Sequence, residues 1–146
     1  MKIGLGSDHG GYELKEQIKV HLEENGYEVV DFGTHSGEAV DYPDAAAPVC
    51  IAVQNGEVDC GMLFCGTGIG ISMSANKFKN IRAALCSDVY SAKMAKLHNN
   101  AQIICMGGRV TGRDLAFMIA DTWLETEFEG GRHNRRIEKI HKIEEL

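Results

Sequence analysis

Proline and paired cysteines are both scarce in this chain of 146 residues. Only two prolines accompany its 17 glycines, so the high glycine content does not indicate a low-complexity linker. The five cysteines are odd in number and include no CxxC pair, which argues against a disulfide framework and a structural zinc site. The longest uninterrupted apolar run, Ala45 to Val53, contains a proline and is too short to span a bilayer. We therefore expect a cytoplasmic protein with free thiols, no signal peptide and no membrane partner.

Basic side chains are in the minority, with 15 against 21 acidic ones and a formal net charge of −6. This balance disfavours nucleic acid as a partner. The segment 130–146 is the exception, because it holds five basic and three acidic residues. A local positive cluster on an acidic protein suits a small anionic ligand. The hydrophobic content of 44% predicts one domain, residues 1–146, with its own core.

Short apolar segments alternate with amphipathic ones along the whole chain. Strands are predicted at residues 3–6, 28–32, 60–65, 82–86 and 102–106. Helices are predicted at residues 11–24, 43–53, about 71–77, about 89–98, 111–126 and 133–143. This alternation predicts a Rossmann-like three-layer α/β sandwich, in which a five-stranded parallel sheet carries helices on both faces.

The last two predicted helices have different surroundings. The helix at 111–126 is expected to bury Leu115, Met118, Ile119 and Trp123. The helix at 133–143 follows the crossover helix of the fifth strand, so the two helical layers have no obvious place for it. We expect this C-terminal helix to pack on a second subunit.

The segment Cys65-Gly-Thr-Gly-Ile-Gly70 is the sharpest local signal, and it follows a buried strand. Ligands of parallel sheets bind at the carboxyl ends of strands. Alternating glycines allow main-chain N–H groups to converge on an anion, and a following helix adds its positive end. The spacing is neither GxGxxG nor GxxxxGK[ST], so it matches no standard nucleotide loop. A plain tight turn between strand and helix is the alternative interpretation.

Ionisable residues lie beside the glycine clusters. Cys65 is a candidate nucleophile or base, whereas the other four cysteines are interpreted as buried structural residues. Asp8 and His9 end the first strand, where they either face the ligand or only form a capping loop. His98 is either functional or only a partner of a helix dipole. His21, His35 and His141 are expected at the surface without partners, and no histidine spacing indicates a metal site.

Three arginines are candidates for binding an anion. Arg132 and Arg136 are four residues apart, so they share a helix face and could grip a phosphate between them. Solvated surface charge is the alternative. Arg109 follows a glycine pair at the end of the fifth predicted strand.

With these residues assembled, the chain resembles the type B ribose-5-phosphate isomerases, a family that includes allose-6-phosphate and galactose-6-phosphate isomerase subunits. The resemblance runs nearly end to end and depends on the order and spacing of several motifs. These are GSDHGG at 6–11, DYPD at 41–44, CGTGIGISMSANK at 65–77, RAALCS at 82–87, HNNAQ at 98–102, GGR at 107–109 and EGGRHNRR at 129–136.

The resemblance implies interconversion of ribose 5-phosphate and ribulose 5-phosphate, a step of the pentose phosphate pathway, through a cis-enediolate and without metal or cofactor. Cys65 would be the base, assisted by Thr67, and Asp8 and His98 would help open the sugar ring. Other residues would bind substrate: the anion hole of Gly66, Gly68, Ile69 and Gly70, the hydroxyl ligands Tyr42 and Asn99, and the phosphate ligands His9, Arg109, Arg132 and Arg136. Some members place a glutamate where this chain has Ile71, so the chain fits the cysteine subclass.

Two other functions stay open at this stage. A hexose-phosphate isomerase would use the same chemistry on a longer substrate, and the loop at 33–43 would set the pocket length. A phosphate- or nucleotide-binding module without catalysis is the second alternative. The expected partners are a sugar phosphate and a second copy of the chain, which shares its active sites through Arg132 and Arg136. Pairing of dimers into tetramers is left open.

Overall fold

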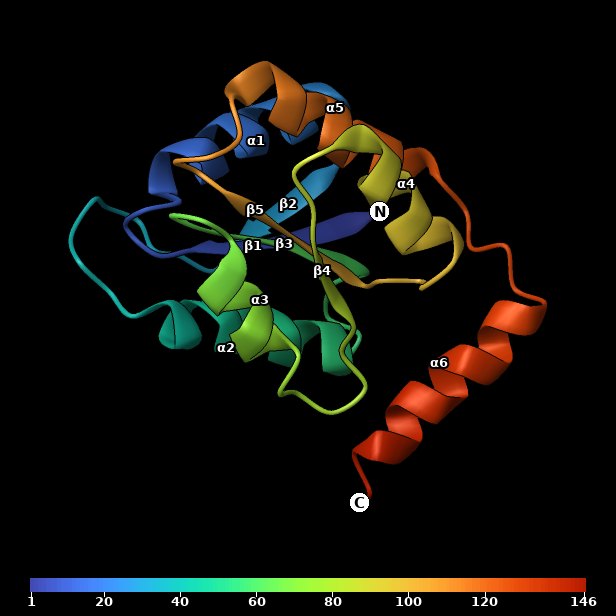
Figure 1. Ribbon diagram of the computed structural model, residues 1–146. Coiled ribbons are helices and arrows are strands. Elements are labelled where there is room, and N and C mark those ends of the chain that lie inside the picture. The colour runs from blue at the N-terminus through green and yellow to red at the C-terminus, as the bar shows by residue number, and fades with distance from the viewer.

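The five predicted strands form one parallel sheet in the computed structural model, which describes residues 1–146 (Figure 1). The strands are β1 (Lys2–Ser7), β2 (Glu28–Asp31), β3 (Cys60–Cys65), β4 (Ala83–Leu85) and β5 (Ile103–Gly107). Their order across the sheet is β2-β1-β3-β5-β4. The register pairs Ser7 with Phe64 and Cys65 with Gly107. The carboxyl ends of β1, β3 and β5 therefore lie side by side.

Helices cover both faces of this sheet, which confirms the predicted three-layer α/β sandwich (Figure 1). The helices are α1 (Tyr12–Glu24), α2 (Tyr42–Gln54), α3 (Ile69–Ala75), α4 (Val89–Leu97), α5 (Arg113–Glu125) and α6 (Arg132–Ile143). One face is covered by α1, α4 and α5, and the other by α2 and α3. No helix is both long enough and apolar enough to cross a membrane.

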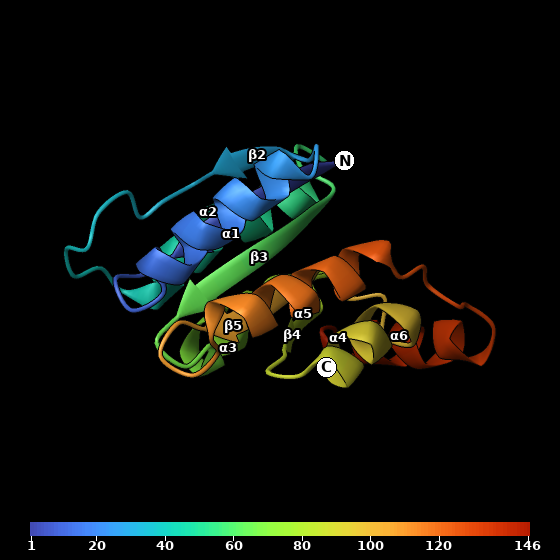
Figure 2. The same cartoon turned by 90° about the horizontal axis from the view of Figure 1, so that it is seen from above.

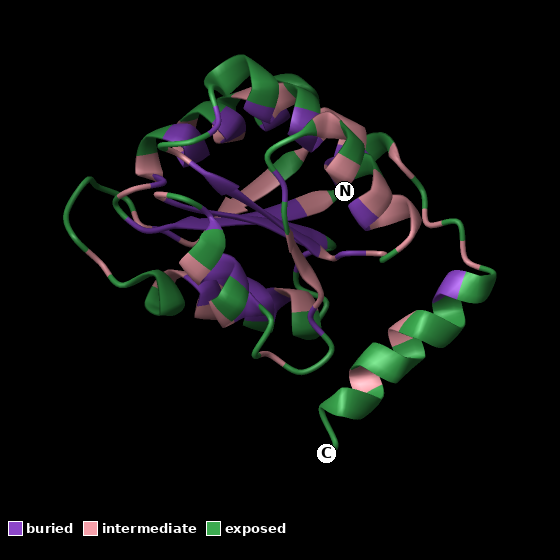
Figure 3. Cartoon of the chain, viewed as in Figure 1, coloured by how far each residue is buried: buried purple, intermediate pink, exposed green.

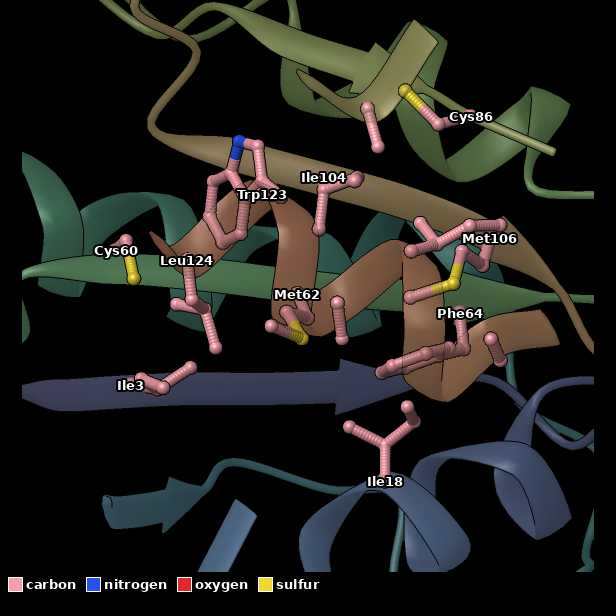
Figure 4. Close-up of a cluster of buried hydrophobic side chains, with 14 of the residues drawn as sticks. Ile3, Ile18, Cys60, Met62, Phe64, Cys86, Ile104, Met106, Trp123 and Leu124 are labelled. Carbon is pink, nitrogen blue, oxygen red and sulfur yellow. The ribbon is translucent and has the colours of Figure 1, made fainter. Parts of the chain in front are cut away.

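The strands divide their side chains between two cores because successive residues point to opposite faces. In β3, Met62 and Phe64 join the larger core, where Trp123 of α5 is fully buried (Figure 4). Leu63 and Cys65 point the other way, into the core beneath α2 and α3. The alternation thus directs Cys65 toward the short helix that follows the glycine loop.

Two sequence-based expectations about side chains on the α1 and α5 face are wrong. Leu115 and Met118 are 40% and 58% exposed, because the buried stripe of α5 runs through Ala116, Ile119, Ala120 and Trp123. His21 has partners: its Nε2 lies 2.8 Å from Asp121 Oδ1, and its ring stacks on Phe117. The apolar stripe and the imidazole both link α1 to α5.

Helix α6 stands outside the two helical layers (Figures 1 and 3). His133 is its one buried residue, and Ile140 and Ile143 are 43% and 64% exposed. The helix is thus left with an apolar stripe that its own chain covers only in part.

A buried ion pair fixes the end of β2. The Lys15 side chain is fully buried, and its Nζ lies 2.7 Å from both carboxylate oxygens of Asp31. Asp31 Oδ1 also accepts a hydrogen bond from Gly33 N at 2.9 Å. Burial alone would raise the pKa of Asp31, but the hydrogen bonds and the charge of Lys15 outweigh it and lower that pKa. The carboxylate therefore stabilises the fold in its charged form.

Replacement of Asp31 by asparagine should lower the free energy of unfolding by up to about 3–5 kcal/mol, because the buried Lys15 ammonium keeps only the partly exposed Glu16 carboxylate, 3.0 Å away, as its countercharge. Urea unfolding measures the loss. The matched control is Glu28→Gln at an exposed ion pair with Lys2, where we expect less than about 1 kcal/mol. Equal effects of the two substitutions would contradict the prediction.

The same pair predicts a pH dependence. The folded-state pKa of Asp31 lies below its ordinary value of 3.8, so its contribution to stability is complete above that value and is lost as the pH falls through the folded pKa. The stability difference between the parent chain and Asp31→Asn should therefore narrow only in the acid range. A difference that narrows on the alkaline side instead would contradict this assignment.

Candidate active site

The glycine loop at 66–70 folds around the sulfur of Cys65. Gly68 N donates a hydrogen bond to Cys65 Sγ at 3.1 Å, and Ile69 N donates one to Thr67 Oγ1 at 3.1 Å. Gly68 has φ of +83°, and a Cβ there would lie 2.5 Å from Leu85 Cδ1. Only glycine meets both conditions. The sequence therefore forces a turn that aims a main-chain N–H at the thiol.

All five cysteines are free and buried, so burial does not single out Cys65. Burial raises the pKa of Cys50 to about 12 and the pKa of Cys60 and of Cys86 to about 11. It also raises the pKa of Cys105 well above its usual value. These four thiols stay protonated at neutral pH, as expected of structural residues. Cys65 is the only one of the five whose sulfur accepts a hydrogen bond from a main-chain N–H.

Two neighbouring turns pack their main chains directly against this loop. Gly108 N donates to Cys65 O at 2.8 Å, and Arg109 N donates to Gly66 O at 2.9 Å. A Cβ on Gly10 would lie 2.9 Å from Gly66 N, and one on Gly107 would lie 2.6 Å from the Thr67 carbonyl carbon. Close approach of three backbones thus requires the glycines that the sequence places here.

Side chains from these turns surround the loop. The Asp8 carboxylate is held by Gly10 N and Gly11 N at 2.9 and 3.1 Å. The Tyr42 ring packs against Gly70 so closely that a Cβ on that glycine would lie 2.6 Å from ring carbons. His9 Nδ1 accepts a hydrogen bond from Val40 N at 3.3 Å. The carboxyl edge of the sheet therefore gathers ten predicted site residues: Asp8, His9, Tyr42, Cys65, Gly66, Thr67, Gly68, Ile69, Gly70 and Arg109.

A cavity of about 220 Å³ adjoins this group at the ends of β1 and β2. It is lined by Ser7, Asp44, Ala45 and part of the loop at 32–40. A larger cavity of about 430 Å³ lies between α1 and α5, beside His21 and Phe117. Neither cavity is lined by a predicted site residue, but the smaller one lies next to them, because Ser7 precedes Asp8 and Val40 N donates to His9.

The other four predicted site residues, His98, Asn99, Arg132 and Arg136, lie at the opposite edge of the sheet. His98 ends α4, and the chain then enters β5 at its amino end, where Gly61 N donates to Gln102 O at 2.9 Å. The six residues of β3 separate this edge from Cys65 by about 16 Å. Figure 2 shows the tip of β3 and helix α6 at opposite sides of the molecule. One chain therefore holds two separate groups of predicted site residues.

Residues from α4 and α6 meet in the second group. The rings of His98 and His133 stack with centroids 4.3 Å apart, and Glu129 Oε2 lies 3.6 and 3.7 Å from their Nε2 atoms. His133 is buried, and burial together with His98 lowers its pKa. Sequence reasoning missed His133 and Glu129, although both lie within the EGGRHNRR motif. The only signal was their position beside Arg132.

This trio is the one group of residues with ligand atoms close enough for a metal ion, all within 4.8 Å of one another. No histidine spacing in the sequence indicated such a convergence. The two rings are inclined by only 15°, so their nitrogen lone pairs lie in two nearly parallel planes. An ion about 2 Å from both nitrogens would lie outside both ring planes. The stacked arrangement of the two rings therefore does not favour metal binding.

Arg132 and Arg136 are exposed on α6, and no carboxylate lies within 4.0 Å of either guanidinium. Two unpaired cations on one helix face are suited to an anion. The expectation that His141 has no partner is wrong, because its Nε2 lies 2.7 Å from Arg82 Nη1. That contact holds α6 against the start of β4.

Comparison with known proteins agrees with this geometry. The profile of the Ribose/Galactose Isomerase family matches residues 3–140. The chain belongs to this family. Ribose-5-phosphate isomerase B of Escherichia coli is 52% identical over 144 residues, covering 99% of this chain and 97% of that protein. Membership confirms the resemblance and the isomerase class predicted from the sequence.

Solved structures confirm the fold. Ribose-5-phosphate isomerase B of Clostridium thermocellum superposes with a TM-score of 0.98 at 56% identity, covering 99% of this chain and 98% of the other. The ribose 5-phosphate isomerase of Thermotoga maritima gives a TM-score of 0.95 at 51% identity, covering 97% of each chain.

The different surroundings of the thiols predict selective alkylation. At mildly alkaline pH, iodoacetamide should modify Cys65 first, because the N–H of Gly68 stabilises negative charge on that sulfur while burial keeps the other four thiols protonated. Peptide mass spectrometry locates the label. The chain unfolded in urea, in which all five cysteines should react, is the control. Labelling of Cys60 or Cys86 as fast as Cys65 would contradict the assignment.

Proposed function

We propose that this protein interconverts ribose 5-phosphate and ribulose 5-phosphate through a cis-enediolate, with Cys65 as the base. The observation that carries the proposal is the contact between Cys65 Sγ and the glycine loop, 3.1 Å from Gly68 N, at the edge where parallel sheets bind ligands. Relatives named for this reaction are more than 50% identical over nearly the whole chain. The reaction moves hydrogen within one molecule, so it needs no external oxidant or reductant.

The proposed chemistry divides among the residues at the carboxyl edge. The Cys65 thiolate takes the proton from C2 of the open-chain aldose and returns it to C1. The hydroxyl proton on O2 moves to O1 in the same exchange, so the product is the ketose. The N–H groups of the 66–70 loop stabilise the negative oxygen of the enediolate. Thr67 orients the loop through its bond with Ile69 N.

We propose that a second copy completes this site. His98, Asn99, Arg132 and Arg136 lie at the far edge of their own chain, too distant from Cys65 to share one small substrate with it. A two-fold dimer would place the far edge of each copy against the near edge of the other and create two whole sites. The exposed Ile140 and Ile143 on α6 support such an interface. His9 and Arg109 would then hold the phosphate together with Arg132 and Arg136 of the second copy.

We also propose a five-carbon substrate and a cytoplasmic location. The relatives described above carry the name of ribose 5-phosphate. A relative from Pectobacterium atrosepticum, 43% identical and covering 96% of this chain and 93% of its own, is named D-erythrulose-4-phosphate isomerase. This fold therefore serves more than one chain length, and we assign the choice of length to the loop at 33–43 beside the 220 Å³ cavity. Five free thiols and a phosphorylated substrate suit the cytoplasm.

Replacement of Cys65 by alanine should lower turnover of ribose 5-phosphate by about 10²–10⁴-fold and abolish exchange of the C2 hydrogen with deuterium oxide, since the base is missing. Nuclear magnetic resonance follows the exchange. Cys60→Ala is the matched control, and it should retain both activities. A well-folded Cys65→Ala variant with near-normal exchange would remove Cys65 as the base. Faster turnover of allose 6-phosphate by the parent protein would favour the hexose alternative.

Shared sites predict complementation between two inactive variants. In a mixed dimer of Cys65→Ala and Arg136→Ala chains, one site carries both defects and the other carries neither. Random pairing should therefore restore about a quarter of the parent turnover in the mixture, and about half in the isolated mixed dimer. Coexpression with two different affinity tags isolates the mixed dimer. If the mixture is no more active than the two variants measured apart, each site lies within a single chain.

A further inference from the structure

Arg82 lies just before β4, half-buried between three segments of the chain. Its Nε donates a hydrogen bond to Asn99 O at 3.0 Å, and its Nη2 donates one to Asn100 O at 2.8 Å. Its Nη1 donates to His141 Nε2 on α6, 2.7 Å away. One guanidinium thus links the segment before β4, the turn after His98 and the C-terminal helix α6.

The acceptors of Arg82 are all uncharged, which is unusual for a half-buried guanidinium. No carboxylate lies within 4.0 Å of it, and the nearby Glu144 instead accepts a hydrogen bond from Asn80 N at 2.9 Å. Glu144 Oε1 also lies 3.4 Å from His141 Nδ1. This contact favours the tautomer with hydrogen on Nδ1, so that Nε2 is free to accept from Arg82. The burial of an unpaired charge is costly, so a simple packing role would be served better by an apolar residue.

The turn that Arg82 grips is itself constrained. Asn100 has φ of +45°, in the left-handed region that residues other than glycine rarely adopt. Gln102 also holds the turn to the segment before β4, because Arg82 N donates a hydrogen bond to Gln102 Oε1 at 2.8 Å. The peptide carbonyls of Asn99 and Asn100 therefore have a fixed direction. The backbone at Asn99 in turn fixes the position from which its exposed side chain extends.

We propose that Arg82 is a positioning residue that locks the turn bearing His98 and Asn99 to the helix bearing Arg132 and Arg136. The four residues then reach the second copy as one rigid unit, with a set distance between the groups that contact the sugar and those that grip its phosphate. This inference rests on the proposed function, and it assigns to Arg82 no contact with the substrate.

Arg82→Lys tests the proposal, because lysine keeps the charge but cannot bond two carbonyls and an imidazole at once. Misplacement of the unit should lower kcat for ribose 5-phosphate by about 100-fold. The inhibition constant of inorganic phosphate should stay within about threefold, since Arg132 and Arg136 remain on a folded helix. Arg135→Lys, an exposed exchange on α6, is the matched control and should change neither value.

His141→Ala provides a second test in case Arg82→Lys does not fold. It removes the acceptor on α6 and leaves both carbonyl contacts, so kcat should fall by about tenfold with the same unchanged phosphate inhibition. Because the two residues act through one contact, the double variant should be no slower than Arg82→Lys alone. A kcat near that of the parent in either folded variant would refute the positioning role. So would equal changes in kcat and in the inhibition constant of phosphate. Losses of kcat that add up in the double variant would refute it as well.

The parent protein separates this inference from the proposed function. If the parent chain isomerises ribose 5-phosphate but the variants show any of the refuting results, only the role of Arg82 is lost. If the parent chain neither isomerises the sugar nor exchanges its C2 hydrogen, the proposed function fails first, and the role of Arg82 falls with it.

Discussion

The site depends on the close approach of three main-chain turns at one edge of a parallel sheet. Register places Cys65 beside Gly107 and Ser7 beside Phe64, so the turns that follow β1, β3 and β5 have to share a narrow space. They fit because their contact positions are glycines, where a Cβ would lie within 3 Å of a neighbouring main-chain atom. Hydrogen bonds from Gly108 and Arg109 then join the turns. The chemistry follows from this packing, since it delivers a thiol, a carboxylate and an arginine to one point without any long-range ion pair.

The same parallel topology keeps the two groups of predicted site residues apart within a single chain. Each crossover helix returns the chain to the amino edge, so a residue at the end of α4 is delivered about one strand length away from Cys65. Helix α6 begins near that residue and carries its unpaired arginines outward. The proposed two-fold partner would remove this separation, because residues that lie far apart within one chain would meet across the contact between two chains. In the proposed dimer, catalysis therefore requires assembly, because only the dimer holds a complete site.

Sequence reasoning recovered what is encoded locally. The strands and helices match within about two residues at most ends, and the glycine clusters indicated the carboxyl edge, because turns and periodicity are local properties. It failed where the answer depended on tertiary packing. Leu115 and Met118 are apolar but lie beside the stripe that α5 buries. His133 and His141 found partners on elements 35 and 59 residues away in the chain. The order of the motifs predicted that His98 and Cys65 belong to one site. Only the sheet topology reveals that the two residues lie far apart within one chain.

In the proposed site, helix α6 explains how so acidic a protein would hold a phosphorylated ligand. Its positive charge would be neutralised if the helix packed among the carboxylates of the main body. The structure instead holds the helix away from the body through polar contacts at its ends, with Glu129 near His98 and His133, and with His141 on Arg82. Arg132 and Arg136 thereby stay free of carboxylates, at the cost of an apolar stripe left partly exposed. A second copy that covers the stripe would bring its own glycine loop to the same guanidinium groups, so the exposed isoleucines and the free arginines are two consequences of one arrangement.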